Sequence, residues 1–239
     1  GDVYKRQVIC TLLALVHAVL VVPRLPEPSA AEVGAEVLAV KPRYCDLRTP
    51  GFVGTTCLVA GVAGAVCAAA PRWCLPLWWV WGGSVTTLVG VDVRTTFLPR
   101  RFWFGCVGQA ALGTLVAAGI VAPGVHDLLA MLLSMALGAV GSALPFWLLW
   151  RFSGSLGYGD VRLAAGMGAV AASLGADAVM TSLLGATLVG AVMSVGVTWW
   201  RRRHPSAWGA AIAYGPALWI GPWIGLLTVR ALSLIHISE

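Results

Sequence analysis

Long apolar segments recur along the chain and constrain its fold more than any other feature. Of 239 residues, 59% are hydrophobic and only 11% are charged, whereas soluble domains carry about 25% charged residues. Several runs approach the roughly 20 apolar residues that span a bilayer as a helix. We therefore expect an all-α, polytopic integral membrane protein of about eight transmembrane helices, because a helix satisfies its own backbone hydrogen bonds in lipid. The predicted spans are residues 8–23, 51–70, 75–91, 102–122, 127–150, 161–176, 178–200 and 210–230.

The basic residues predict how these spans are oriented. With the loop Arg24–Gly51 placed in the cytoplasm, 12 basic residues fall on the cytoplasmic side, and only Arg72 and Arg230 fall on the other side. This bias follows the positive-inside rule. The 12 residues are Arg24, Lys41, Arg43, Arg48, Arg94, Arg100, Arg101, Arg151, Arg162, Arg201, Arg202 and Arg203. The net charge of +6 thus reflects topology in a lipid bilayer, and nucleic-acid binding is not expected.

The two ends of the chain are related at the level of codons. One back-translation of DVYKRQ, residues 2–7, is GAT GTG TAT AAG AGA CAG, whose reverse complement encodes LSLIHI, residues 232–237. The nucleotide sequence resembles a transposase adapter used in sequencing libraries. We expect residues 1–7 and 232–239 to be translated adapter, which would not belong to the native fold. The remainder divides into a first helix with its loop, residues 8–50, and a membrane domain, residues 51–231.

The six cysteines have neither zinc-site nor disulfide spacing. None forms a C-x-x-C pair, and most lie in or beside apolar runs, where cysteine acts as a small apolar residue. Zinc sites usually combine closely spaced cysteine or histidine pairs. We therefore expect no metal site, and the sequence carries no cofactor signature.

Two aspartates stand at the predicted cytoplasmic mouths of spans. Asp92 follows the third span and Asp160 precedes the sixth, 68 residues later. Ionisable groups at membrane depth are costly and usually functional. When two carboxylates lie close together, one tends to retain a proton. Such a pair can take a proton from water and polarise a peptide carbonyl, as in aspartic proteases.

Glycine and proline flank these aspartates. Asp160 stands in GSLGYGDVRLAAGMGA, where Gly157 and Gly159 would let the backbone bend sharply and approach another segment. Asp92 stands in VDVRTTFLPR, where Pro99 would stop a helix from continuing. The arginines of that segment would favour the ionised form of Asp92.

Three segments resemble motifs of the prepilin peptidases, the membrane aspartic proteases of type IV pilus and related secretion systems. GYGDVRLAAGMGA is similar to G-x-G-D-x-K-L-x-A-x-x-G-A, with arginine where lysine is usual. VDVRTTFLPR resembles D-x-R-x-x-x-L-P-N, with Arg100 in place of asparagine, and AYGPALWIG resembles P-F-G-P-F-L. The positions that we single out are Gly157, Gly159, Asp160 and Arg162 in the first segment, Asp92, Arg94 and Pro99 in the second, and Gly215 and Pro216 in the third.

The resemblance implies a function, a site and a location. Asp92 and Asp160 would be the catalytic pair of an aspartic-type endopeptidase domain over residues 51–231. The substrate would be a prepilin or pseudopilin, cut at the cytoplasmic face of the bacterial inner membrane. Family members that also methylate the product carry paired C-x-x-C motifs between the first two spans. Because Arg24–Gly51 is short and holds only Cys45, we do not expect methyltransferase activity.

Other interpretations remain open. Presenilins and signal peptide peptidases also carry G-x-G-D, and Pro216-Ala217-Leu218 spells their P-A-L element, but their first aspartate follows tyrosine, whereas Val91 precedes Asp92. A proton-coupled transporter could use the same aspartates as relay groups, although no internal repeat is visible and both acids lie at one face. A truncated, inactive fragment is a third alternative, and the oligomeric state is open.

Overall fold

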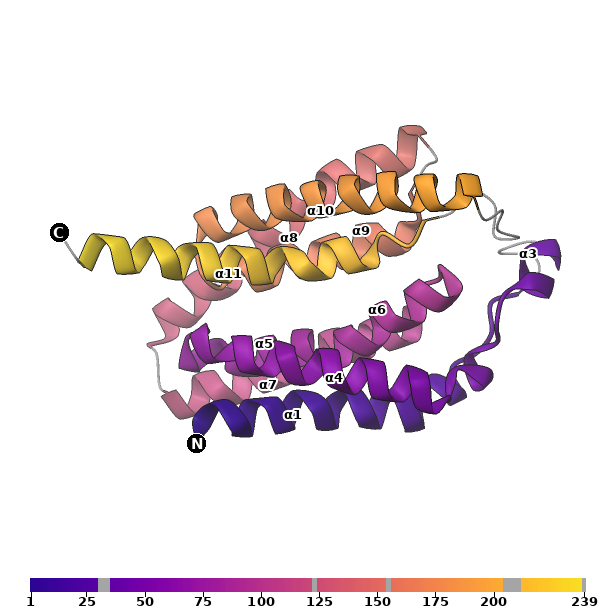
Figure 1. The fold of residues 1–239 in the computed structure, drawn as a ribbon. Coiled ribbons are helices and arrows are strands. Elements are labelled where there is room, and N and C mark those ends of the chain that lie inside the picture. The colour runs from indigo at the N-terminus through magenta and orange to yellow at the C-terminus, as the bar shows by residue number, and fades with distance from the viewer. Residues whose placement is uncertain (30–34, 122–123, 154–155, 204–211, 238–239) are drawn as a thin grey trace.

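The computed structural model describes residues 1–29, 35–121, 124–153, 156–203 and 212–237, and the regular elements in these ranges are all helices (Figure 1). The α-helices are α1 (Asp2–Val16), α3 (Ala35–Val40), α4 (Pro50–Val66), α5 (Leu75–Gly82), α6 (Ser84–Thr95), α7 (Arg100–Val121), α8 (Val125–Ser153), α9 (Tyr158–Ala172), α10 (Ala176–Arg203) and α11 (Gly215–Ile237). A π-turn (His17–Val21) and a 3₁₀ turn (Val22–Arg24) extend α1, and short 3₁₀ turns lie at Tyr44–Leu47, Cys67–Ala69 and Arg72–Cys74.

Seven helical stretches of the described residues are long and apolar enough to cross a membrane, which confirms an all-α, multi-pass membrane protein. They are Asp2–Arg24, Pro50–Ala69, Arg72–Thr95, Arg100–Ile120, Asp127–Ser153, Ala176–Arg203 and Gly215–Leu234. The predicted edges of spans at residues 122 and 210–211 lie outside the described ranges.

The predicted sixth span, residues 161–176, is the shorter helix α9. Its 15 residues extend about 22 Å at 1.5 Å per residue, less than the roughly 30 Å of a bilayer core. Helix α9 packs against α8, α10 and α11, and the side chains of Leu163, Ala164, Met167 and Ala171 are fully buried. Because other helices surround it, α9 can be short without leaving backbone groups exposed to lipid.

The two ends of the chain are helical where they are described. Helix α1 includes residues 2–7 and α11 includes residues 232–237, both of which the codon pattern assigns to adapter. Residues 238–239 lie outside the described ranges. Helical structure does not report the origin of a segment, so the adapter assignment stays a prediction.

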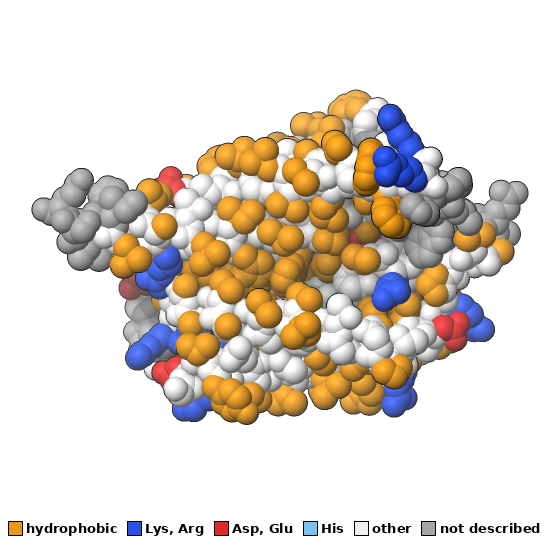
Figure 2. All heavy atoms as spheres, in the orientation of Figure 1, with side chains coloured by type: hydrophobic (Ala, Val, Ile, Leu, Met, Phe, Trp, Pro, Cys, Tyr) orange, Lys and Arg blue, Asp and Glu red, His pale blue; other side chains and the backbone are white. Residues whose placement is uncertain are grey.

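Neighbouring helices pair off into two halves that lie side by side (Figure 1). In the first half α1 packs along α4 and α5 contacts α7, and in the second half α8 packs along α9 and α10 along α11. The halves meet where α6 contacts α11 and α5 contacts α9. Hydrophobic side chains cover much of the visible surface, and lysines and arginines gather toward the two ends of the long axis (Figure 2). This pattern suits a protein surrounded by lipid.

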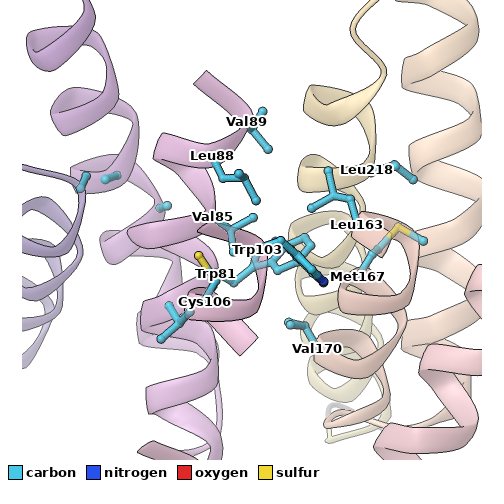
Figure 3. Close-up of a cluster of buried hydrophobic side chains, with 14 of the residues drawn as sticks. Trp81, Val85, Leu88, Val89, Trp103, Cys106, Leu163, Met167, Val170 and Leu218 are labelled. Atoms are coloured by element: carbon cyan, nitrogen blue, oxygen red, sulfur yellow. The ribbon is translucent and has the colours of Figure 1, made fainter. Parts of the chain in front are cut away.

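Large apolar side chains line the space between the halves (Figure 3). Those labelled in the figure come from α5, α6 and α7 on one side and from α9 and α11 on the other: Trp81, Val85, Leu88, Val89, Trp103 and Cys106 face Leu163, Met167, Val170 and Leu218. Two tryptophans also exchange hydrogen bonds across the boundary. The indole N–H of Trp81 donates to the carbonyl of Trp219, and that of Trp219 donates to the carbonyl of Trp81, each at 3.0 Å. These contacts fix α11 against α5.

Candidate active site

Asp92 lies in the last turn of α6 and is buried, with 4% of its surface exposed. Helix α6 ends at Thr95, and Thr96 takes a left-handed conformation with φ of 57°, which is uncommon for a β-branched residue. The N–H of Thr96 donates to the Asp92 carbonyl at 2.6 Å. The backbone therefore leaves the helix axis at Thr96, four residues after the aspartate.

The Asp92 carboxylate reaches a distant part of the chain. Its Oδ2 accepts a hydrogen bond of 3.1 Å from the backbone N–H of Gly215, the first residue of α11. The first N–H groups of a helix have no partner within the helix and carry partial positive charge, so they favour an anion. Pro216 follows in the first turn, where its missing N–H costs nothing.

Glycine is required at position 215 by this contact. A Cβ atom at Gly215 would lie 2.5 Å from Asp92 Oδ2 and 3.3 Å from its Cγ. No side chain fits there unless the carboxylate moves. The resemblance singled out Gly215 as a motif position, and the structure supplies the steric reason.

Asp160 lies in the first turn of α9 and is 9% exposed. Its Oδ2 accepts a hydrogen bond of 3.1 Å from the N–H of Gly157, the residue that precedes the helix, and its own N–H donates to the Gly157 carbonyl at 3.0 Å. An acidic side chain at this position satisfies a free N–H group and suits the positive end of the helix dipole. Asp160 is thus held by its immediate sequence neighbours.

The glycines before Asp160 play different parts. The prediction of a sharp bend at Gly157 is wrong, because the φ of −78° and ψ of 149° of this residue are ordinary extended angles that other residues adopt. The close approach expected at Gly159 is confirmed. A Cβ there would lie 2.9 Å from the Cβ of Leu98, so Gly159 lets α9 pack against the segment between α6 and α7.

Three helix ends meet at one end of the molecule: the end of α6, the start of α9 and the start of α11 (Figure 1). The Asp92 and Asp160 carboxylates lie close enough there to interact electrostatically. Tyr214, directly before α11, adjoins them, since burial and the charge of Asp160 raise the pKa of its hydroxyl. The structure therefore brings together the two aspartates that the sequence placed at one membrane face.

The loop before α4 supplies two site residues that sequence reasoning missed. Lys41 donates to the hydroxyl of Thr96, and its Nζ lies 3.9 Å from the centre of the Phe97 ring. Burial lowers the pKa of Lys41, and the charge of Asp92 opposes that shift. Burial raises the pKa of Tyr44, and the charges of Glu27 and Asp92 raise it further. Lys41 stands 51 residues before Asp92, so nothing in the local pattern pointed to this contact.

The remaining motif residues lie near the site in the chain, and no hydrogen bond joins them to the two carboxylates within the described residues. Pro99 is buried and directly precedes α7, but it does not end α6, which stops four residues earlier at Thr95; Arg94 is exposed. The Arg162 guanidinium lies 5.4 Å from the centre of the Tyr158 ring. Among the described residues, neither arginine forms an ion pair with Asp92 or Asp160.

The aspartate pair lies apart from an apolar cavity between the two halves. That cavity, about 310 Å³, is lined by apolar residues of α5 to α9 together with Thr114, and no carboxylate lines it. Within the described residues, no three histidine, cysteine, aspartate or glutamate side chains cluster as they would around a metal ion. The chemistry that the structure offers is therefore that of two carboxyl groups at a junction of helix ends.

The fold and this site define a polytopic helical membrane protein with two interacting aspartates at one end of its helices. Sequence comparison adds relatives of one kind. Two proteins called prepilin leader peptidase/N-methyltransferase are similar to the chain. That of Aeromonas hydrophila is 32% identical over 168 residues, which cover 66% of this chain and 51% of the relative. That of Pectobacterium carotovorum subsp. carotovorum is 30% identical over 179 residues, which cover 68% of this chain and 56% of the relative. The protein of that name from Aeromonas salmonicida is 38% identical over 108 residues, 43% of this chain and 35% of the relative.

The chain is thus related to the prepilin peptidase family, the relationship that its motifs predicted. It spans about half the length of the curated relatives that match over most of it. No protein-family model matches the chain, and no solved structure matches it.

Proposed function

We propose that this protein is an aspartic endopeptidase that removes the leader peptide of prepilins or pseudopilins at the cytoplasmic face of the bacterial inner membrane. The observation that carries the proposal is that Asp92 and Asp160, 68 residues apart in the chain, lie close enough at one end of the bundle to interact electrostatically. The names of the relatives support the choice of substrate.

The mechanism uses the two carboxyl groups in different protonation states. The ionised aspartate takes a proton from water, and the resulting hydroxide attacks the carbonyl carbon of the scissile peptide. The protonated aspartate donates to the carbonyl oxygen as negative charge develops there. The carbon–nitrogen bond then breaks, and the leaving amine takes up the proton held by the first aspartate.

The site suits a substrate that is half in the membrane. The aspartates lie at helix ends, where a leader in water and an apolar helix in lipid would place their junction. The basic residues at this end, such as the arginines at the end of α10, suit the cytoplasmic side of a membrane. We propose peptidase activity alone, because the loop of residues 24–51 holds a single cysteine, Cys45, and no C-x-x-C pair.

The test is leader removal in membranes. The chain, with an initiator methionine, is expressed with a prepilin that carries a glycine–hydrophobic junction, beside the variants Asp92→Asn and Asp160→Asn. Each variant keeps the shape of the side chain but cannot ionise, so each is expected to lower the cleavage rate by ~10³-fold or more. Asp177→Asn is the matched control, because Asp177 is exposed in the first turn of α10.

The outcomes separate the alternatives. Cleavage that survives in Asp92→Asn or Asp160→Asn removes that aspartate from the mechanism. Cleavage inside the hydrophobic helix of the substrate, instead of before it, indicates a protease of the presenilin type. If the membrane-inserted chain cleaves nothing but carries protons in a manner that depends on both aspartates, the transporter interpretation replaces the proposal.

A further inference from the structure

We propose that Lys41 is a positioning residue for Asp92: its ammonium group, held against the end of α6 by Thr96 and Phe97, favours the ionised form of the Asp92 carboxylate. The consequence for cleavage rests on the function proposed above, whereas the effect on the ionisation of Asp92 does not. Nothing in the motifs of the chain assigns a role to this lysine.

Lys41 is fixed in place by two contacts at the end of α6. Its Nζ donates to the Thr96 hydroxyl and lies over the Phe97 ring, 3.9 Å from the centre. Thr96 is itself fixed, because its N–H donates to the Asp92 carbonyl and its backbone is left-handed. A lysine side chain normally has much rotational freedom. Here its charge is held at Thr96, which stands one helical turn after Asp92 in the chain.

The segment that carries Lys41 is anchored as well. We call residues 41–47 the strap. The N–H of Tyr44 donates to Glu27 Oε1 at 2.6 Å, and the side chains of Tyr44 and Leu47 are buried. A small cavity of about 30 Å³ between the strap and α6 is lined by Lys41, Tyr44, Thr95 and Phe97, among others. The strap therefore lies against the end of α6 and holds the lysine there.

Lys41 is a cation whose charge interacts with that of Asp92. The other groups that act on this carboxylate are the Asp160 carboxylate, from α9, and the Gly215 N–H, from α11. Tyr44, in the strap, senses the charge of Asp92, and its N–H donates to Glu27; neither of these two residues supplies positive charge. Arg94, two residues after Asp92, is exposed and forms no ion pair with it within the described residues. A positive charge on the strap thus offsets the repulsion between the two carboxylates.

A purely structural lysine would behave differently. If Lys41 only tied the strap to α6, then any side chain that keeps the strap in place would leave the ionisation of Asp92 unchanged. If its charge matters, removal of the charge changes the pH at which Asp92 gains a proton, whether or not the strap stays in place. The measurement must therefore report protonation directly.

A hydrophobic carbodiimide provides that report, because it modifies protonated carboxyl groups in membrane proteins. The chain in lipid vesicles is labelled over a range of pH, and modification of the Asp92 peptide is measured by mass spectrometry. In Lys41→Met, loss of the positive charge is expected to move the midpoint of Asp92 labelling upward by about one pH unit, the order of magnitude of one charge within a helical turn near a protein surface. Lys41→Arg keeps the charge and is expected to stay within a few tenths of a unit of the parent.

Two further variants make the test specific. Lys41→Gln keeps a donor for Thr96 without the charge and is expected to shift the midpoint as Lys41→Met does. Arg48→Met removes a charge from an exposed position just beyond the strap and is expected to shift nothing measurable. An unchanged Asp92 midpoint in both Lys41→Met and Lys41→Gln overturns the proposal.

The same variants link this effect to cleavage. In the prepilin assay, the acidic limb of the pH–rate profile is expected to move to higher pH in Lys41→Met and Lys41→Gln by the shift seen in labelling. If the parent cleaves no prepilin, the proposed function fails, while carbodiimide labelling still decides the role of Lys41. If the parent cleaves and the labelling midpoints coincide, only the role of Lys41 is lost.

Discussion

Asp92 and Asp160 differ in how far along the chain their partners come from. The hydrogen bond of Asp160 Oδ2 comes from Gly157, three residues away, whereas that of Asp92 Oδ2 comes from Gly215, 123 residues away. Asp160 would be oriented in the same way by any helix that began at Tyr158. Asp92 depends on the correct packing of α6, α11 and the strap.

The polarity of the helices sharpens this contrast. Asp160 stands in the first turn of α9, where the helix dipole favours a negative charge, and Asp92 stands in the last turn of α6, where the dipole opposes one. The start of α11 and Lys41 supply the missing stabilisation at Asp92. One member of the pair is therefore built into a local motif, and the other is positioned by tertiary structure. Changes in remote elements should therefore act mainly through Asp92.

The largest effect that tests this contrast is expected at Gly215. The Cβ of Gly215→Ala would lie 2.5 Å from Asp92 Oδ2, so the carboxylate must move by about 1 Å. Since a misplacement of that size can cost about 10²-fold in rate, we expect the rate of leader removal to fall by about that factor.

Two other glycines serve as comparisons for Gly215. A Cβ at Gly157 would lie 3.6 Å from Asp160 Oδ2, an ordinary contact, and one at Gly54, in α4, would meet nothing within 4 Å. Gly157→Ala is expected to lower the rate by less than about tenfold, and Gly54→Ala by a factor within about two. Equal losses at Gly215 and Gly157 would contradict the distinction between the two aspartates.

A smaller effect is expected where α9 meets the segment after α6. In Gly159→Ala, the new methyl group would lie 2.9 Å from the Cβ of Leu98, so the start of α9 would move away from that segment and carry Asp160 with it. We expect about a tenfold loss of cleavage, because the helix end shifts as a body and keeps its internal hydrogen bonds.

The pair of Gly159 and Leu98 can be tested by a double-mutant cycle. Leu98→Ala keeps its Cβ but removes the branched side chain, so the neighbouring backbone gains room to adjust. The double variant Gly159→Ala/Leu98→Ala is expected to recover part of the activity that Gly159→Ala loses, and thus to show coupling between the two positions. Strictly additive losses would show that Gly159 acts through something other than this contact.

The sequence predicted the elements of this fold and the identity of the paired carboxylates for a simple physical reason. Spanning helices must be long and apolar, so their positions are visible in composition alone. Because successive helices reverse direction, an aspartate at the end of the third span and another at the start of the sixth must lie on the same side. The length of α9 was less predictable, because a helix surrounded by protein need not match the thickness of the bilayer.

The contacts that complete the site were out of reach of the sequence. Lys41 and Tyr44 come from a loop whose path over α6 is set by tertiary packing, and charge alone pointed to Arg94, which is exposed. The steric demand on Gly215 became visible only with Asp92 beside it. At Gly157 the sequence predicted a feature that is absent: a glycine in a motif suggested a sharp bend, but the backbone angles there are ordinary. A single sequence therefore predicts contacts between distant residues less well than it predicts local geometry.

The smallest effect that we predict concerns the tryptophans that join the halves. Trp81→Phe and Trp219→Phe each remove one N–H donor and leave one carbonyl without its partner, so each is expected to lower the free energy of unfolding by about 1–2 kcal/mol. Thermal unfolding in detergent measures this, with the exposed Trp147→Phe as control. Because α11 also positions Gly215 against Asp92, we expect each variant to lower cleavage by about two- to fivefold. Stability could instead fall while the cleavage rate and the pH midpoint of Asp92 labelling stay unchanged. That outcome would show that other contacts hold the start of α11, and that Asp92 depends less on the packing between the halves than we propose.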